Sequence, residues 1–251
     1  MANIHPTAVI EDGAVIGEGA EIGPHVTIYR YVTLGPNCRI HAGAVIGDIP
    51  QDLAFKNVES YVRIGANCVI REHVTIHRGT KPDTSTIVGD DCYLMTNSHL
   101  AHNVRLGSRV IVASGALLAG YVEVGDLAFI SGSSLVHQFV RIGRLAMLSG
   151  LSGIGKDVPP FCTTHGIAVN RIAGLNVVGM RRAGMAPAQR AEVKRAFKLL
   201  YRSGLNVTQA LGAIRGEFHA GPALEVCDFI EASARGICRM GEADEEESDA
   251  G

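Results

Sequence analysis

The 251-residue sequence contains no tryptophan, and aromatic residues account for only 5% of it. Platforms that stack single-stranded nucleic acid are built from aromatic side chains, so their scarcity argues against this class of partner. The formal net charge is −2, which leaves no basic field for a phosphate backbone either. We therefore expect no nucleic-acid partner.

Long apolar runs and paired cysteines are also missing. No stretch approaches the roughly 20 apolar residues that span a bilayer, and residues 1–6 contain no basic region ahead of an apolar segment. We expect no membrane insertion, no secretion and a cytoplasmic location. The six cysteines form no C-x-x-C pair, and Cys38, Cys68 and Cys92 share a repeat position at which neighbouring repeats carry Ala, Val or Ser. They are expected to be core residues in a reducing compartment, not metal ligands or disulfide partners.

The sequence does contain a six-residue repeat. Of the 26 residues met at every sixth position from Ile4 to Ile154, 24 are aliphatic, and the exceptions are Asp52 and Pro82. Short strands that each turn one aliphatic side chain inward and bend at the next hexad form a parallel β-helix, a type of β-solenoid. Physical reasoning alone favours a right-handed coil, because parallel crossovers almost always have that hand.

The repeat has two interruptions and a different C-terminal part. Residues 48–61 and 80–86 keep the phase, which predicts loop excursions from an intact β-helix over residues 1–160. Residues 161–186 are expected to form an irregular connector. Residues 187–239 are predicted to form a helical domain, with helices at 187–203, from Asn206 to about 218 and from Pro222 to about 239. The acidic residues 240–251 are expected to be disordered.

Two histidines, His99 and His102, lie within the repeat without being needed for it. If one coil holds 18 residues, His102, Gly120 and Gln138 occupy one column on successive coils. An imidazole can accept a proton near neutral pH, and a glycine N–H beside it can stabilise an oxyanion. The column therefore predicts a general-base site, with exposed structural histidines as the alternative.

A series of motifs carries a family resemblance. The motifs, in chain order, are Gln51–Leu53, Ile76–Thr80, His99–His102, Leu118–Gly120, Val136–Phe139 and Gly174–Arg182. They resemble the UDP-N-acetylglucosamine O-acyltransferase family, and the resemblance runs from Ile4 to about Arg239. It implies a left-handed parallel β-helix of hexapeptide repeats with a triangular cross-section, followed by a C-terminal α-helical domain. It also implies a homotrimer with active sites between neighbouring subunits.

The reaction implied by the resemblance moves an (R)-3-hydroxyacyl chain from acyl carrier protein to the 3-hydroxyl of UDP-N-acetylglucosamine (UDP-GlcNAc). This is the first step of lipid A biosynthesis. His102 would be the general base for direct attack on the thioester and Gly120 the oxyanion donor, with no metal and no other cofactor. The other implied roles are sugar contacts for Asp52 and His99, nucleotide-sugar contacts for His137 and Gln138, UDP contacts for Asn176 and Arg182, and an acyl-chain ruler for Met147 and Gly150.

Three positions depart from the family pattern. Asn103 stands where an aspartate commonly follows the catalytic histidine, and an amide can fix a tautomer but cannot stabilise an imidazolium as a carboxylate does. Ala54 replaces a usual lysine, for which Lys56 could substitute, and Tyr121 replaces a common histidine. These departures predict a reduced or differently pH-dependent rate, and they leave an aminated analogue of UDP-GlcNAc open as the acceptor.

Basic residues crowd one face of the first predicted helix: Arg190, Lys194, Arg195, Lys198 and Arg202. This face is either an ordinary solvated surface or a dock for the acidic acyl carrier protein.

Three other functions are open at this point. One is a zinc-dependent carbonic anhydrase with His77, His99 and His102 as ligands. Another is a non-catalytic hexapeptide scaffold. The third is the related N-acyltransferase, a family with an extra N-terminal domain.

Overall fold

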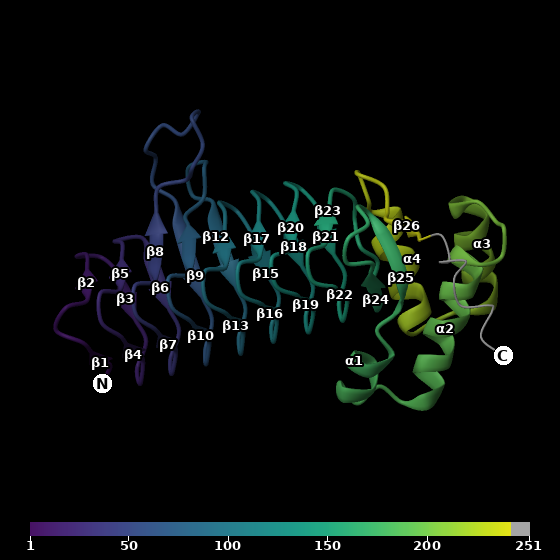
Figure 1. Cartoon of the computed structure of the whole chain (residues 1–251), viewed down its shortest axis with the longest axis horizontal. Coiled ribbons are helices and arrows are strands. Elements are labelled where there is room, and N and C mark those ends of the chain that lie inside the picture. The colour runs from purple at the N-terminus through teal and green to yellow at the C-terminus, as the bar shows by residue number, and fades with distance from the viewer. Residues whose placement is uncertain (242–251) are drawn as a thin grey trace.

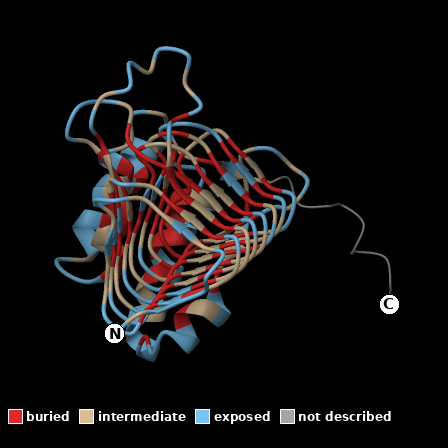
Figure 2. Cartoon of the chain, turned by 90° about the vertical axis from the view of Figure 1, so that its left-hand side faces the viewer, coloured by how far each residue is buried: buried red, intermediate tan, exposed pale blue. Residues whose placement is uncertain are grey.

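The computed structural model describes residues 1–241 and shows a long solenoid with a helical end (Figure 1). Short strands from successive coils stack into three sheets, and along the long axis the coils nest as triangles around a buried interior (Figure 2). The first sheet contains β1 (Asn3–Ile4), β4 (Glu21–Ile22), β7 (Arg39–Ile40), β10 (Val69–Ile70), β13 (Tyr93–Leu94), β16 (Ile111–Val112), β19 (Phe129–Ile130), β22 (Met147–Leu148), β24 (Cys162–Thr164), β25 (Arg171–Leu175) and β26 (Arg239–Met240). The second sheet contains β2 (Val9–Ile10), β5 (Thr27–Ile28), β8 (Val45–Asp48), β11 (Thr75–His77), β14 (His99–Leu100), β17 (Leu117–Leu118), β20 (Leu135–Val136) and β23 (Gly153–Ile154). The third sheet contains β3 (Val15–Ile16), β6 (Val32–Leu34), β9 (Tyr61–Ile64), β12 (Ser85–Val88), β15 (Arg105–Leu106), β18 (Glu123–Val124) and β21 (Arg141–Ile142).

The aliphatic residue of each hexad faces the interior, as the repeat predicts. Ile28, Leu94 and Ile130 have an exposed fraction of 0%, and each lies in register with its counterparts on the neighbouring coils. Burying such a side chain contributes about 1.5–3 kcal/mol. Ile4 is 46% exposed because it belongs to the first coil, which has no coil beneath it. The stack of coils, and not any single coil, therefore supplies the core.

Most coils contain 18 residues, since Leu118 lies in register with Val136 on the next coil. The coil that carries the first excursion is longer, because Ile46 pairs with Ile76, and 76 − 46 = 30. The 18-residue spacing between Ile46 and Ile64 therefore does not mark one coil, because these residues lie in the second and third sheets. The excursion keeps the phase because it adds 12 residues, which are two whole hexads.

The two excursions lie close together along the solenoid. Residues 48–61 form the loop that projects above β8 and β9 in Figure 1. Residues 80–86 lengthen the next coil, in which Ile70 pairs with Leu94 and 94 − 70 = 24. Both loops therefore leave the stack near the coil that carries the candidate histidines.

Four helices follow the solenoid: α1 (Val177–Arg182), α2 (Pro187–Tyr201), α3 (Val207–Glu217) and α4 (Pro222–Glu231). Asn206 caps α3 as predicted, since its side chain accepts a hydrogen bond from Gln209 N at 2.9 Å. Phe197 of α2 packs into the solenoid core, and Arg144 of the solenoid pairs with Glu225 of α4 at 2.7 Å. The helices therefore close the C-terminal end of the solenoid. Within residues 1–241, no helix is both long and apolar enough to cross a membrane.

The expectation of an irregular connector at residues 161–186 is wrong in part. β24 and β25 form an antiparallel pair that extends the first sheet, and α1 follows them. Strands of this kind cover the end of the solenoid, where unpaired backbone groups would otherwise remain.

The third predicted helix is shorter than expected. It ends at Glu231 instead of Arg239, because the following chain returns to the solenoid and forms β26. Cys238 N–H donates to the carbonyl of Asp157, and Arg239 N–H to that of Asn170. Residue 240 of the predicted disordered segment therefore lies in a strand, and its last ten residues, 242–251, lie outside the described residues.

Candidate active site

His102 lies at the corner between β14 and β15. Its carbonyl accepts a hydrogen bond from Tyr121 N at 3.1 Å, and the carbonyl of Gly120 accepts one from Phe139 N at 3.0 Å. These bonds place His102, Gly120 and Gln138 at equivalent corners of three successive coils. The predicted column is therefore present.

Gly120 lies directly against the imidazole of His102. A Cβ built on Gly120 would lie 2.5 Å from Nε2 of His102 and 3.0 Å from Nδ1, so only glycine fits here. The Gly120 N–H makes no hydrogen bond within residues 1–241, and the same holds for the N–H groups of His102 and Gln138. The neighbouring imidazole, and not the free donor alone, therefore distinguishes Gly120.

An apolar groove of about 600 Å³ begins at His102 and covers the outer face of the second sheet. Leu117, Leu135 and Gly153 lie in register on successive coils along it, and the two leucines are 42% and 55% exposed. Val169 lies over Gly153, where an added Cβ would meet its Cγ2 at 3.4 Å. A groove of this shape and polarity fits an alkyl chain, at about 0.8 kcal/mol for each buried CH₂.

The two leucines were not among the predicted site residues. The signal was nevertheless present, because Leu117 and Leu135 follow His99 at 18-residue spacing in the outward strand position.

A polar cleft of about 580 Å³ lies on the other side of His102. Asp52 from the first excursion, Lys81 from the second, and Tyr121 and Gln138 from the corners all line it. His102 also lines this cleft, so its imidazole stands where the apolar groove and the polar cleft meet. The structure thus brings the two excursions and the histidine column together.

Asn103 holds the other side of the His102 ring. Its Oδ1 lies 3.1 Å from Nδ1 of His102, and its side chain is buried, with 7% exposed. The backbone of Asn103 has φ = 60°, in the left-handed region that asparagine tolerates better than most residues. The side chain is therefore fixed from both backbone and hydrogen bonds.

His77 and His99 stack edge to face below this corner, with ring centroids 5.0 Å apart. Burial lowers the pKa of His99 to about 4, helped by His77 and His102 nearby. Burial also lowers the pKa of His77, which is opposed by Asp48 and helped by His102. His99 Nδ1 lies 2.7 Å from Thr75 Oγ1, whereas the buried Nδ1 of His77 has no partner within residues 1–241. Both rings are therefore neutral at physiological pH.

No metal site is formed by these rings within the described part of the chain. Residues 1–241 contain no group of three or more His, Cys, Asp and Glu side chains that could hold a metal ion.

The remaining predicted sugar and nucleotide contacts are dispersed. Asp52 lines the cleft, although one of its oxygens already accepts a hydrogen bond from Ala54 N at 2.9 Å. His137 lines the groove. Asn176 caps α1 by accepting from Gly179 N at 2.8 Å and donates to the carbonyl of Leu145 at 2.9 Å. Both ends of the Asn176 side chain are therefore already used in folding.

Arg182 and the two predicted ruler residues lie away from His102. Arg182 is exposed at the end of α1. Met147 lies in β22 of the first sheet, and Gly150 lies at the corner between the first and second sheets. His102 lies at the corner between the second and third sheets, so one chain alone does not bring these residues together.

The basic face of α2 is partly neutralised. Arg195 pairs with Glu217 at 2.9 Å, and Arg190 donates to the carbonyl of Met185 at 2.6 Å. The Arg202 guanidinium lies 5.7 Å from the centre of the Phe197 ring. Lys194 and Lys198 are exposed and make no ion pair within residues 1–241. These two lysines are the free charges of the predicted dock.

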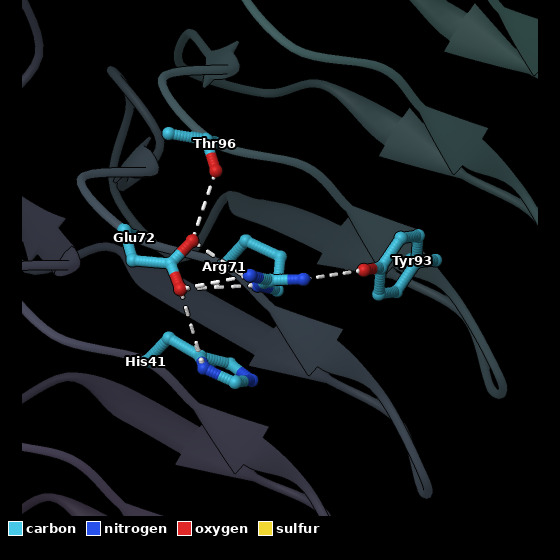
Figure 3. A network of polar contacts seen from close by, with 5 residues as sticks. All are labelled: His41, Arg71, Glu72, Tyr93 and Thr96. Carbon is cyan, nitrogen blue, oxygen red and sulfur yellow. Dashed lines mark hydrogen bonds and ion pairs between the residues drawn. The ribbon is translucent and has the colours of Figure 1, made fainter.

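A separate polar cluster lies on the corner between the first and second sheets (Figure 3). Glu72 accepts hydrogen bonds from Arg71 and Thr96, each at 2.9 Å, and lies 3.6 Å from His41. Arg71 also donates to the Tyr93 hydroxyl at 2.8 Å. The hydrogen bonds from Arg71 lower the pKa of Glu72 to about 2. The cluster contains none of the predicted site residues, and it braces the corner through its own internal contacts.

A larger hollow of about 880 Å³ separates the third sheet from α4. Arg144 and Glu225, which pair with each other across it, line this hollow. It contains none of the predicted site residues, so its size does not make it the active site.

A hexapeptide solenoid with a histidine between an apolar groove and a polar cleft defines the chain as a hexapeptide-repeat acyltransferase. The family model described as bacterial transferase hexapeptide matches residues 13–48 and 85–120. The model described as UDP N-acetylglucosamine O-acyltransferase, domain 2, matches residues 157–238.

Relatives narrow the class to one family. A Thermodesulfovibrio yellowstonii protein named acyl-(acyl-carrier-protein)–UDP-N-acetylglucosamine O-acyltransferase is 41% identical, over 95% of this chain and 100% of the relative. The solved structure of UDP-N-acetylglucosamine acyltransferase from Campylobacter jejuni matches with a TM-score of 0.85 at 34% identity, over 95% of this chain and 100% of that chain. The Bacteroides fragilis enzyme structure matches with a TM-score of 0.83 at 40% identity, over 94% and 100%. The chain belongs to the UDP-N-acetylglucosamine O-acyltransferase family, and its fold is the left-handed parallel β-helix with a helical C-terminal part.

Proposed function

We propose that this acyltransferase moves an (R)-3-hydroxyacyl chain from acyl carrier protein to the 3-hydroxyl of UDP-GlcNAc, the first step of lipid A biosynthesis. One observation carries the proposal: His102 lines both an apolar groove that fits an alkyl chain and a polar cleft that fits a sugar. A thioester at the mouth of the groove and a hydroxyl in the cleft would meet at this imidazole. We propose the cytoplasm as the compartment, because both substrates are made there.

The proposed mechanism uses His102 and the Gly120 N–H. Nε2 of His102 removes the proton of the sugar hydroxyl while its oxygen attacks the thioester carbonyl carbon. The carbonyl electron pair moves onto oxygen, where the N–H of Gly120 stabilises the charge. When the tetrahedral intermediate collapses, the C–S bond breaks and His102 returns the proton to the leaving thiol. A positioned general base contributes about 10²–10⁴-fold and one oxyanion donor about 10²–10³-fold.

We further propose that the working enzyme is a homotrimer. His102 lies at the edge between the second and third sheets, whereas Gly150 lies at the edge between the first and second. A site that uses both edges needs one edge from each of two neighbouring copies. A threefold arrangement supplies this pairing three times.

The acyl carrier protein is proposed to dock on α2 near Lys194 and Lys198, whose charges are not neutralised within residues 1–241. An acidic carrier would be attracted to these lysines and guided toward the groove.

The test is an assay with UDP-GlcNAc and 3-hydroxyacyl carrier proteins of several chain lengths. We expect transfer of the acyl chain by the wild type and a loss of at least about 10²-fold for His102→Ala. A His102→Ala variant that retains the wild-type rate would remove His102 from the mechanism.

The assay should include the aminated analogue of UDP-GlcNAc as a competing acceptor, because Ala54 and Tyr121 line the cleft where the family commonly has other residues. A higher kcat/KM for the amine than for UDP-GlcNAc would change the acceptor and leave the role of His102 intact.

A further inference from the structure

The side chain of Asn103 is the centre of a hydrogen-bond network that reaches beyond His102. Its Oδ1 lies 3.0 Å from the backbone nitrogen of Thr80 and 3.0 Å from the Thr80 hydroxyl. The Thr80 hydroxyl lies 2.9 Å from the hydroxyl of Tyr121. Thr80 opens the second excursion, and Tyr121 stands one coil above Asn103. The network therefore joins three separate segments around one carboxamide.

The direction of every bond in the network follows from one group. A backbone N–H can only donate, so the Asn103 atom that faces Thr80 N must be the oxygen and not the amide nitrogen. That oxygen also faces Nδ1 of His102, so Nδ1 must carry the proton. His102 therefore has its bare lone pair on Nε2, on the side where Gly120 and the groove lie.

The hydroxyl groups are ordered by the same reasoning. Oδ1 of Asn103 has no proton, so the Thr80 hydroxyl must donate to it. With its only proton used, Thr80 Oγ1 accepts from the Tyr121 hydroxyl. The Tyr121 ring is held for this contact, because it stacks on Phe139 at 4.9 Å and meets the edge of His102 at 5.3 Å.

We propose that Thr80 and Tyr121 are positioning residues for His102, which together with Asn103 replace the orienting function of a carboxylate. This inference rests on the proposed role of His102 as the base. Thr80 holds the carboxamide through two donors, and Tyr121 completes the chain by satisfying the Thr80 oxygen. Asn103 and Tyr121 thus act as a matched pair, since an asparagine that could turn over would offer its NH₂ to His102 and place the proton on the wrong nitrogen.

The first test is selective ¹⁵N-histidine NMR on the full chain, with the His102 signal assigned from its absence in His102→Ala. We expect neutral His102 to be the Nδ1–H tautomer in the wild type and a mixture of tautomers in Asn103→Leu, which has no acceptor. An Nε2–H tautomer in the wild type would overturn the inference, whatever the enzyme assay shows.

The second test is a kinetic cycle with Thr80→Val and Tyr121→Phe. We expect each substitution to lower kcat by roughly 3- to 10-fold with little change in either KM, because neither residue touches the substrate in this role. The double variant should be no slower than Thr80→Val alone, because both act through one chain of bonds. Thr80→Ser, which keeps the hydroxyl, should retain the wild-type kcat.

The outcomes separate this inference from the proposed function. Multiplying effects in the double variant, or a rise in the KM for the acceptor at unchanged kcat, would overturn the positioning role while leaving His102 as the base. A His102→Ala enzyme of undiminished rate would instead overturn the proposed function, even with the Nδ1–H tautomer observed.

Discussion

Replacing Gly120 by alanine is a direct test of the His102 geometry. The new Cβ would lie 2.5 Å from Nε2 of His102, whereas ordinary van der Waals contact begins near 3.4 Å. The imidazole must therefore retreat by 3.4 − 2.5 = 0.9 Å, about the misplacement that costs a catalytic group 10²-fold. The backbone of Gly120 lies outside the left-handed region, so alanine itself fits the chain, and its N–H remains available.

The assay is steady-state acyl transfer with Gly120→Ala, after its thermal midpoint has been compared with that of the wild type. We expect kcat to fall about 10²-fold. Gly174→Ala is the matched control, because a Cβ at Gly174 meets nothing within 4 Å. A Gly120→Ala enzyme within about twofold of the wild type would refute the reasoning, because an imidazole displaced by this much could not still be the base.

Three further predictions concern charge. Asn103→Asp keeps the acceptor for Nδ1 and adds a charge that stabilises protonated His102, so the acidic limb of the kcat/KM profile should move to higher pH by about 1 unit; an unmoved limb would contradict this. His99 has its pKa lowered to about 4 against about 6.5 in the unfolded chain, so the folded state binds fewer protons and loses up to about 3 kcal/mol as the pH falls from 6.5 to 4. In urea titrations at pH 7 and 4.5, His99→Asn should therefore lose less stability than the wild type, and an equal loss would argue against the lowered pKa. Lys194→Glu with Lys198→Glu should raise the KM for the acyl carrier protein several-fold at low salt, while Arg195→Gln, which removes a charge already paired with Glu217, should have little effect; a change confined to the KM for UDP-GlcNAc would place the dock elsewhere.

The hexad predicts the core of the solenoid because its physics is local and repeats. Leu118 and Val136 must face inward for any coil to stack on the next, so their period is visible without a structure. The same period placed Gly120 beside His102, since neither excursion lies between them.

Thr80 could not be found in this way. It lies 23 residues before Asn103, and a fixed 18-residue column would have placed residue 85 at that position. The partner of Asn103 depends on the length of the second excursion, which sets a coil of 24 residues. Contacts across a coil of unknown length are tertiary facts, and sequence periodicity does not determine them.

The C-terminal part shows the same limit. Apolar spacing favours a helix as far as Arg239, but three-dimensional neighbours decide otherwise, because Cys238 and Arg239 find backbone partners on the solenoid. Asn176 is a similar case, because its side chain caps α1 and also bonds to Leu145. A motif position can thus be required for folding as well as for a ligand.

The separation of His102 from Gly150 on different edges leads to a test of the proposed trimer. His102→Ala chains and Gly150→Trp chains, each inactive alone toward the preferred acyl length, would be unfolded, mixed in equal amounts and refolded together. If each site takes one edge from each of two neighbours, random assembly leaves about a quarter of the sites with both edges intact, and about a quarter of the wild-type activity should return. The control is the same mixture without unfolding, which should stay inactive because subunits have not exchanged. If exchange is confirmed by mass spectrometry and no activity returns, then a single chain must supply both edges of its own site, and the argument from edge placement to a shared site fails.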